Sequence, residues 1–179
     1  MSFVLRPLPA FVAVLALLLP PQAQSLAPFA TTPEDVVERM LVLARTTPKD
    51  VVYDLGSGDG RIPILAAKLY GARGVGIELN GSLVDQARMR AQTAGVAGLV
   101  QFRHEDALTA DISEATVVTL YVLASGNAKL LPRLKSQLRP GTRIVSHAFS
   151  MGKDWPADRI DHFVSAAGDE VTLYLWTVK

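Results

Sequence analysis

The sequence contains no cysteine and only three histidines, and these shortages exclude several kinds of chemistry. Without cysteine the chain can form no disulfide, no thiolate zinc site and no cysteine nucleophile. The histidines are scattered at His104, His147 and His162, which argues against a histidine-rich metal cage, so we expect no metal site. Basic residues outnumber acidic ones by only 18 to 17. This balance provides no basic stripe for nucleic acid, and we expect no nucleic-acid partner.

The chain also lacks an apolar run of the roughly 20 residues that a membrane-spanning helix needs. A shorter run extends from Ala10 to Leu19, after the basic residue Arg6 and before the small-residue region 23–25. A positive start, a short apolar run and small residues are the parts of a secretory signal peptide. We therefore expect residues 1–25 to be a signal peptide or an uncleaved N-terminal anchor. The pattern predicts an exported or periplasmic protein, with membrane contact only through this segment.

Residues 26–179 are expected to form one α/β domain, because strand-like and helix-like segments alternate along them. A first helix is expected from Pro33, with Thr32 as its cap. Strands are expected at 51–55, 74–79, 100–104, within 115–123, and at 142–146, 160–165 and 171–178; further helices are expected at about 61–70, 82–94 and 127–138. This order predicts a single Rossmann-like, doubly wound, mostly parallel seven-stranded sheet with an antiparallel C-terminal strand.

A glycine loop follows the first predicted strand, in the run Asp54-Leu55-Gly56-Ser57-Gly58-Asp59-Gly60-Arg61. Glycines let a backbone turn tightly and approach a ligand closely, and α/β sheets bind ligands at such strand ends. A dinucleotide fingerprint needs a glycine where this chain has Arg61, and the lysine of a P-loop is also missing. Asp54 and Asp59 would repel a pyrophosphate. The loop is therefore suited to an uncharged or cationic ligand that carries an amino group.

Two further acids follow the second and third predicted strands. Glu78 ends the second strand, and Asp106, followed by Ala107, comes just after the third. A carboxylate at the position of Glu78 can accept both hydroxyls of a ribose, and Asp106 could accept the amine of an adenine. Each acid alone would be an ordinary loop or cap residue. Acids at three successive strand ends favour a nucleoside site.

Together, Asp54-x-Gly56-x-Gly58-x-Gly60, Glu78 and Asp106-Ala107 resemble class I S-adenosylmethionine-dependent methyltransferases. More narrowly, the run 54–61 with Gly76-Ile77-Glu78-Leu79-Asn80 resembles the ATP-synthase c-subunit lysine methyltransferases and their bacterial relatives, and more distantly Dot1-like enzymes.

The resemblance implies that residues 26–179 are a methyltransferase domain that uses S-adenosyl-L-methionine as its cofactor. Asp54 and the glycine loop, Ser57 and Asp59 included, would hold the methionine end of the cofactor. Glu78 would bind the ribose, and Asp106 with Ala107 would bind the adenine. The implied reaction is N-methyl transfer to a protein lysine.

Two residues at the later strand ends are expected near the acceptor. Related N-methyltransferases often carry an Asn- or Asp-Pro-Pro-Tyr tetrapeptide where this chain has Thr119-Leu120-Tyr121-Val122, which argues against adenine or glutamine acceptors. We expect Tyr121 to line the acceptor channel and His147 to accept a proton, although either could simply be a packing residue. The sequence leaves two other functions open: an exported nucleoside-binding protein without catalysis, and a methyltransferase acting on a small molecule.

Overall fold

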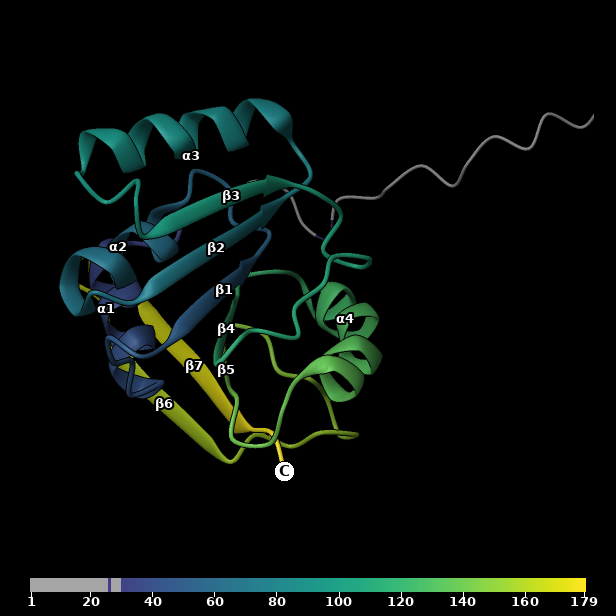
Figure 1. The fold of residues 1–179 in the computed structure, drawn as a ribbon. Coiled ribbons are helices and arrows are strands. Elements are labelled where there is room, and N and C mark those ends of the chain that lie inside the picture. The colour runs from purple at the N-terminus through teal and green to yellow at the C-terminus, as the bar shows by residue number, and fades with distance from the viewer. Residues whose placement is uncertain (1–25, 27–29) are drawn as a thin grey trace, which may run out of the picture.

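The computed structural model describes Leu26 and residues 30–179, so the predicted leader 1–25 lies outside the described residues (Figure 1). The helices are α1 (Glu34–Leu43), α2 (Arg61–Tyr70), α3 (Gly81–Thr93) and α4 (Ala124–Gln137). The strands are β1 (Val51–Leu55), β2 (Arg73–Glu78), β3 (Val100–His104), β4 (Val117–Leu120), β5 (Arg143–His147), β6 (Arg159–Val164) and β7 (Glu170–Thr177). In this part of the chain, no helix has the length and apolar character needed to cross a bilayer.

The seven strands form one sheet in the order β3-β2-β1-β4-β5-β7-β6, which confirms the predicted fold class. The first five strands are mutually parallel, and β7 runs antiparallel to both of its neighbours, β5 and β6. Strand order reverses at β1, which lies between β2 and β4. In such sheets the crevice at the carboxyl ends of the strands beside this reversal is the usual ligand site.

Helices cover both faces of the sheet (Figure 1). Because side chains alternate along a strand, Val52 packs with α1 and α2 while its neighbour Tyr53 packs on the other face with α4. All five residues of β1 are buried, as expected for a central strand of a parallel sheet. This double burial explains why Asp54 is the one charged residue of the strand.

Two expected helix starts differ from the structure. The cap residue of α1 is Pro33, and no side chain caps this helix; the Thr32 hydroxyl instead faces His147. Helix α4 begins at Ala124, three residues before the expected start at 127, and Pro132 lies inside it. Asn127, the expected first residue of this helix, therefore lies within the first turn of α4. Its side chain is buried.

Candidate active site

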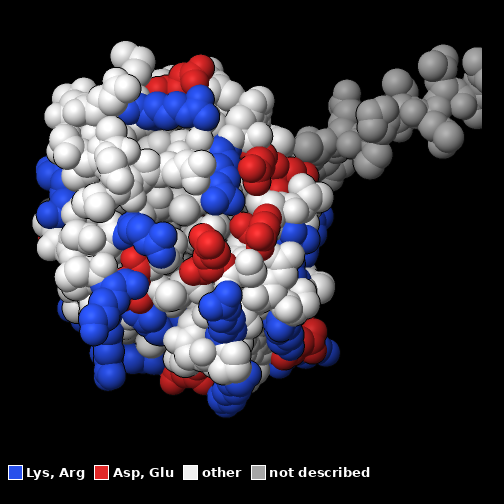
Figure 2. Space-filling model, in the orientation of Figure 1, with Lys and Arg blue, Asp and Glu red and all other residues white. Residues whose placement is uncertain are grey.

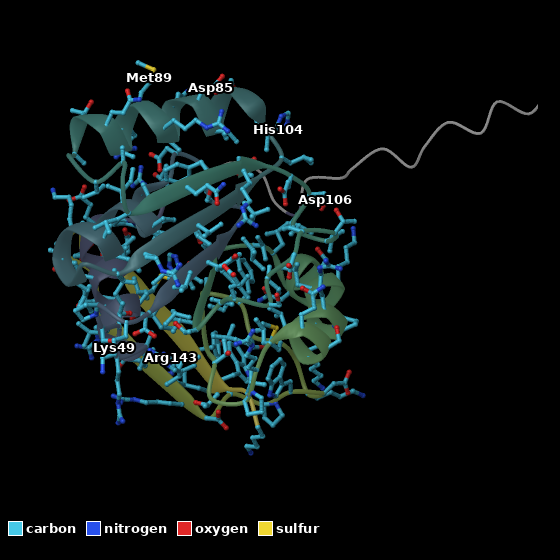
Figure 3. All side chains as sticks on the ribbon, viewed as in Figure 1. Lys49, Asp85, Met89, His104, Asp106 and Arg143 are labelled. Atoms are coloured by element: carbon cyan, nitrogen blue, oxygen red, sulfur yellow. The ribbon has the colours of Figure 1, made fainter. Side chains whose placement is uncertain are left out.

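The candidate site lies at the carboxyl ends of the parallel strands, where the pairing brings the predicted residues together. Strand β1 pairs with β2 and β4, so Asp54 lies opposite Gly76 on one side and Thr119 on the other. Figure 3 shows His104 and Asp106 at this end of the sheet, and Lys49 and Arg143 at the opposite end. Among the described residues, no cluster of His, Asp and Glu is placed to hold a metal ion.

The glycine loop between β1 and α2 needs its glycines for conformation and for space. Gly56, Gly58 and Gly60 have φ values of 85°, 52° and 77°, in the left-handed region that side chains rarely adopt. A Cβ atom on Gly60 would lie 2.6 Å from the Phe102 ring and 2.7 Å from the Ala87 Cβ. The backbone N–H groups of Gly56 and Ser57 both donate to the carbonyl of Ile77, at 2.9 and 3.0 Å. The loop is therefore fastened to β2.

Asp54 is a buried carboxyl beside this loop, with 3% of its surface exposed. Its Oδ1 accepts a hydrogen bond of 2.8 Å from the Thr119 hydroxyl. Burial raises the pKa of Asp54 to about 7; the Thr119 hydrogen bond opposes this rise, and the charges of Glu78 and Asp59 add to it. The carboxyl therefore titrates near neutral pH, and a cationic group placed beside it would favour its ionised form.

Glu78 bridges the loops that follow β1 and β2. Its Oε2 accepts from the Gly58 N–H at 2.9 Å, and its Oε1 accepts from the Asn80 N–H at 2.8 Å. A carboxylate has about four lone-pair positions, so each oxygen can accept a second hydrogen bond. The two backbone donors hold the carboxylate still, as binding of a pair of hydroxyl groups requires.

The third predicted acid, Asp106, follows β3 and is partly buried. Its Oδ1 accepts from the Leu108 N–H at 2.8 Å, and its backbone carbonyl accepts from Thr109 and Ala110. Ala107 is buried in the core cluster that also contains Val122. The turn is thus fixed by its own hydrogen bonds.

Asp59 differs from the expectation that it presents a negative charge to the ligand. Arg61 donates to both of its carboxylate oxygens, at 3.0 and 2.7 Å, and Arg90 donates to Oδ2. Burial alone would raise the pKa of Asp59, but the Arg61 hydrogen bonds and the charges of Arg61 and Arg90 outweigh it and hold that pKa below its usual range. The charge of Asp59 is balanced inside the protein.

Tyr121 and His147 come together as a stacked pair, with ring centroids 4.1 Å apart and planes at 25°. His147 is 8% exposed, and burial lowers its pKa, so the imidazole is neutral at pH 7. Its Nδ1 lies 3.5 Å from the Thr32 hydroxyl. A neutral imidazole retains one nitrogen able to accept a proton.

The end of β5 is held by Asn127, whose side chain is fully buried. Its Nδ2 donates to the Ser146 hydroxyl at 3.2 Å and to the Phe149 carbonyl at 2.9 Å. These bonds hold the Ser146 side chain and the Phe149 backbone, which lie on either side of His147 in the chain. Asn127 is a functional candidate that sequence reasoning missed, because only the fold brings it to β5.

One hollow joins several of these residues. It is lined by Ala30, Thr31, Thr32, Asp54, Gly56, Ser57, Gly58, Asp59, Arg61, Ile62 and Tyr121. Gly60, Glu78, Asp106, Ala107 and His147 are outside this lining. The sequence before Pro33 predicts only the start of a helix and does not indicate that residues 30–32 line the hollow. No sequence signal indicates this role for Arg61 and Ile62 either.

Comparison with known proteins identifies the family. A model of the ANTKMT methyltransferase domain matches residues 54–159. The chain belongs to this family. A protein-lysine N-methyltransferase of Saccharolobus islandicus (strain REY15A) is 40% identical over 152 residues, 84% of this chain and 93% of that protein. The adenine nucleotide translocase lysine N-methyltransferase of Mus musculus is 38% identical over 116 residues, 64% of this chain but only 50% of the mouse protein.

Solved structures of methyltransferases agree with this membership. A crystal structure of an RNA methyltransferase from Salinibacter ruber in complex with S-adenosyl-L-homocysteine has a TM-score of 0.77 and 57% identity, covering 83% of this chain and 94% of that one. The structure of an S-adenosylmethionine-dependent methyltransferase from Thiobacillus denitrificans, also in complex with S-adenosyl-L-homocysteine, has a TM-score of 0.58 and 31% identity. The match covers 65% of this chain and 48% of that one. This member of the ANTKMT family is an S-adenosylmethionine-dependent methyltransferase, as the resemblance predicted.

The residues of the site suit this cofactor. Carboxylates at Asp54, Glu78 and Asp106 offer acceptors for an ammonium group, a ribose diol and an adenine amine, and the positive-φ glycines leave backbone room for a close ligand. When bound, S-adenosylmethionine supplies an electrophilic methyl group. This chain fixes the loop through Ile77, orients the Glu78 carboxylate through Gly58 and Asn80, and holds the neutral imidazole of His147 against the Tyr121 ring.

Proposed function

We propose that this methyltransferase transfers its methyl group to the ε-amino group of a lysine in a protein acceptor. The observation that carries this proposal is the charge at the site end of the molecule. Glu105 follows β3, and Glu34 and Asp35 begin α1 beside the hollow; these three acids are separate from Glu78 and Asp106, which bind the cofactor in this proposal. A lysine side chain is attracted to such an edge, whereas the phosphates of RNA are repelled by it.

The opposite end of the sheet has a different character. Lys and Arg side chains gather at the lower end of the molecule in Figure 2, the end at which Figure 3 places Lys49 and Arg143. Exposed basic residues there include Lys49, Arg73 and Arg139. The basic residues thus border the end of the sheet that is remote from the glycine loop. This separation favours a cationic acceptor at the site.

A lysine acceptor must lose a proton before it can attack, since its ordinary pKa is about 10.4. Two groups support this step in the proposal. The neutral imidazole of His147 can take up the proton, and the stacked Tyr121 ring forms part of the wall of the hollow. Positioning of the amine supplies the rest of the rate enhancement.

RNA is the second candidate acceptor, because the Salinibacter ruber relative at 57% identity is an RNA methyltransferase. One experiment separates the two. The purified full chain is incubated with S-adenosylmethionine carrying a tritiated methyl group, together with cell protein or total RNA. We expect the label in protein, and methyl-lysine after acid hydrolysis. Label in RNA alone would overturn the lysine proposal, and a Glu78→Gln variant, expected to bind the cofactor more weakly, serves as the low-activity control at limiting cofactor concentration.

We also propose an exported location for the protein, from the sequence pattern of residues 1–25. Cell fractionation with mass spectrometry of the N-terminus tests it. We expect the protein in the periplasmic or membrane fraction. Recovery of the chain with its first residues intact in the cytosolic fraction would contradict the proposal.

A further inference from the structure

Arg61, the first residue of α2, has an unusual set of partners for a residue that follows a cofactor loop. Its Nε and Nη2 donate to the two oxygens of Asp59, at 3.0 and 2.7 Å, while its Nη1 donates to the backbone carbonyl of Thr32 at 2.8 Å. The Arg61 side chain is only 21% exposed. One planar guanidinium therefore joins the glycine loop to a segment 29 residues earlier in the chain.

Thr32 continues this connection across the end of the sheet. The residue is 3% exposed, and its hydroxyl lies 3.5 Å from Nδ1 of His147, the ring that stacks on Tyr121. Its main chain contacts the cofactor side through Arg61, and its side chain faces the acceptor side. With Ala30 and Thr31 it forms one wall of the hollow whose other lining includes Asp54 and the glycine loop.

We propose that Arg61 is a positioning residue for methyl transfer: by binding Asp59 and the Thr32 carbonyl together, it holds residues 30–32 as the wall of the cofactor pocket. The forked shape of the guanidinium is needed, since two of its nitrogens bind the carboxylate while a third reaches the carbonyl. Lysine can replace the charge but not this fork.

A second arginine–aspartate pair in the molecule provides a control, which distinguishes a role of Arg61 at the site from a general contribution to stability. Arg39 of α1 donates to both oxygens of Asp161 in β6, at 2.6 and 3.1 Å. The pair has the same two-bond geometry, but neither of its residues lines the hollow. Arg39→Gln is therefore the control for loss of an arginine–aspartate pair without loss of the wall.

The test uses the absence of cysteine from the full chain. Thr32→Cys introduces a single thiol at the buried wall position and leaves the backbone carbonyl that Arg61 binds. The rate at which this thiol reacts with a maleimide reports how often the wall opens. We expect Arg61→Gln in this background to raise the rate about tenfold, because a charge-assisted hydrogen bond is lost, and Arg39→Gln to leave it unchanged.

Calorimetric titration with S-adenosylhomocysteine gives the second readout. We expect Arg61→Gln to raise the dissociation constant about tenfold, and Arg39→Gln to leave it within twofold. Equal labelling rates in the two backgrounds, or faster labelling with unchanged affinity, would overturn the proposal. If Arg61→Gln fails to fold, Arg61→Lys replaces it: a labelling rate and a dissociation constant both above the wild-type values support the proposal, and wild-type values for both refute it.

Discussion

Two sides of the site are built by contacts of very different range: the glycine loop with Asp54 and Glu78, which is the cofactor side in the proposed function, and Thr32 with Tyr121 and His147, which is its acceptor side. On the cofactor side, the Gly58 N–H binds Glu78 across 20 positions of sequence. On the acceptor side, Thr32 meets His147 across 115 positions. Short-range construction lets each loop take its shape from its own glycines and acids. The acceptor side takes shape only when the whole sheet has formed.

The two sides also differ in how they hold titratable groups. Asp54 on the cofactor side is a buried acid whose pKa is raised, and His147 on the acceptor side is a buried base whose pKa is lowered. Both shifts arise mainly because burial disfavours the charged form. Stability should therefore respond to pH with opposite signs on the two sides, and the largest and smallest effects predicted below test this.

The largest expected effect belongs to Asp54. Between its ordinary pKa of 3.8 and its folded pKa of about 7, the folded chain keeps a proton that the unfolded chain releases. The free energy of unfolding should therefore fall as pH rises through this window, by roughly 4 kcal/mol in all. Urea midpoints of the cofactor-free protein from pH 4 to 8 measure it. Asp54→Asn should remove this slope, and Asp85→Asn, at an exposed residue, should retain it; parallel slopes for the wild type and Asp54→Asn would refute the prediction.

Gly60→Ala tests how tightly the cofactor loop packs against its neighbours. The added Cβ would collide with Phe102 and Ala87 while the residue keeps a φ of 77°. Left-handed backbone and overpacking together should cost about 3 kcal/mol of unfolding free energy. Gly95→Ala is the control, because Gly95 has a similar φ of 71° and no atom within 4 Å of an added Cβ. If both variants lose the same stability in chemical denaturation, packing of the loop is not what requires glycine at position 60.

Glu78→Gln should act on cofactor binding more than on folding. The amide keeps the shape of the side chain but places an NH₂ group against one of the two backbone donors, Gly58 or Asn80. Loss of charge-assisted hydrogen bonds should raise the dissociation constant for S-adenosylhomocysteine about 30-fold. Calorimetry with Glu105→Gln, which removes an exposed charge nearby, gives the comparison. An equal loss of affinity in both variants would mean that Glu78 contributes only its negative charge and no specific hydrogen bonds to the cofactor.

The sequence located the glycine loop and the acids at the strand ends for a physical reason. Glycines with positive φ and acids at strand ends are local requirements, so Asp54, Gly58 and Glu78 could be identified without a structure, and the seven-stranded sheet followed from the alternation of segments. Arg61 could not be identified in this way, because the partner that defines its position, Thr32, is in another segment. Asn127 was missed for the same reason.

The compensation of the Asp59 charge by arginines could not be predicted from the sequence either. Two acids in a glycine loop suggest a negative surface, yet Arg90 of α3 and Arg61 of α2 both form ion pairs with Asp59. Compensation of a charge depends on side chains that meet only in the fold. Predictions from residue type therefore hold better for backbone conformation than for electrostatics.

The smallest expected effect belongs to His147, and it sharpens the comparison of the two sides. Burial lowers the pKa of this imidazole below 6.5, so the unfolded chain binds a proton more readily than the folded chain does. The contribution to unfolding free energy is therefore lost as pH falls below about 6.5 and recovered as pH rises, opposite in sign to that of Asp54. Urea midpoints from pH 5 to 7.5 for the wild type and His147→Gln measure it.

We expect His147→Gln to lose this acid sensitivity while His162→Gln, at an exposed histidine of β6, keeps it. An unchanged slope in His147→Gln would mean that the imidazole is not held neutral by the fold, and the proposed proton acceptor would lose its support. Opposite pH dependences of the unfolding free energy at Asp54 and His147 would instead show that the raised pKa belongs to Asp54 and the lowered pKa to His147. Above about pH 7 the enzyme would then have an ionised acid beside the glycine loop and an uncharged base beside Tyr121, an arrangement that suits transfer to an amine.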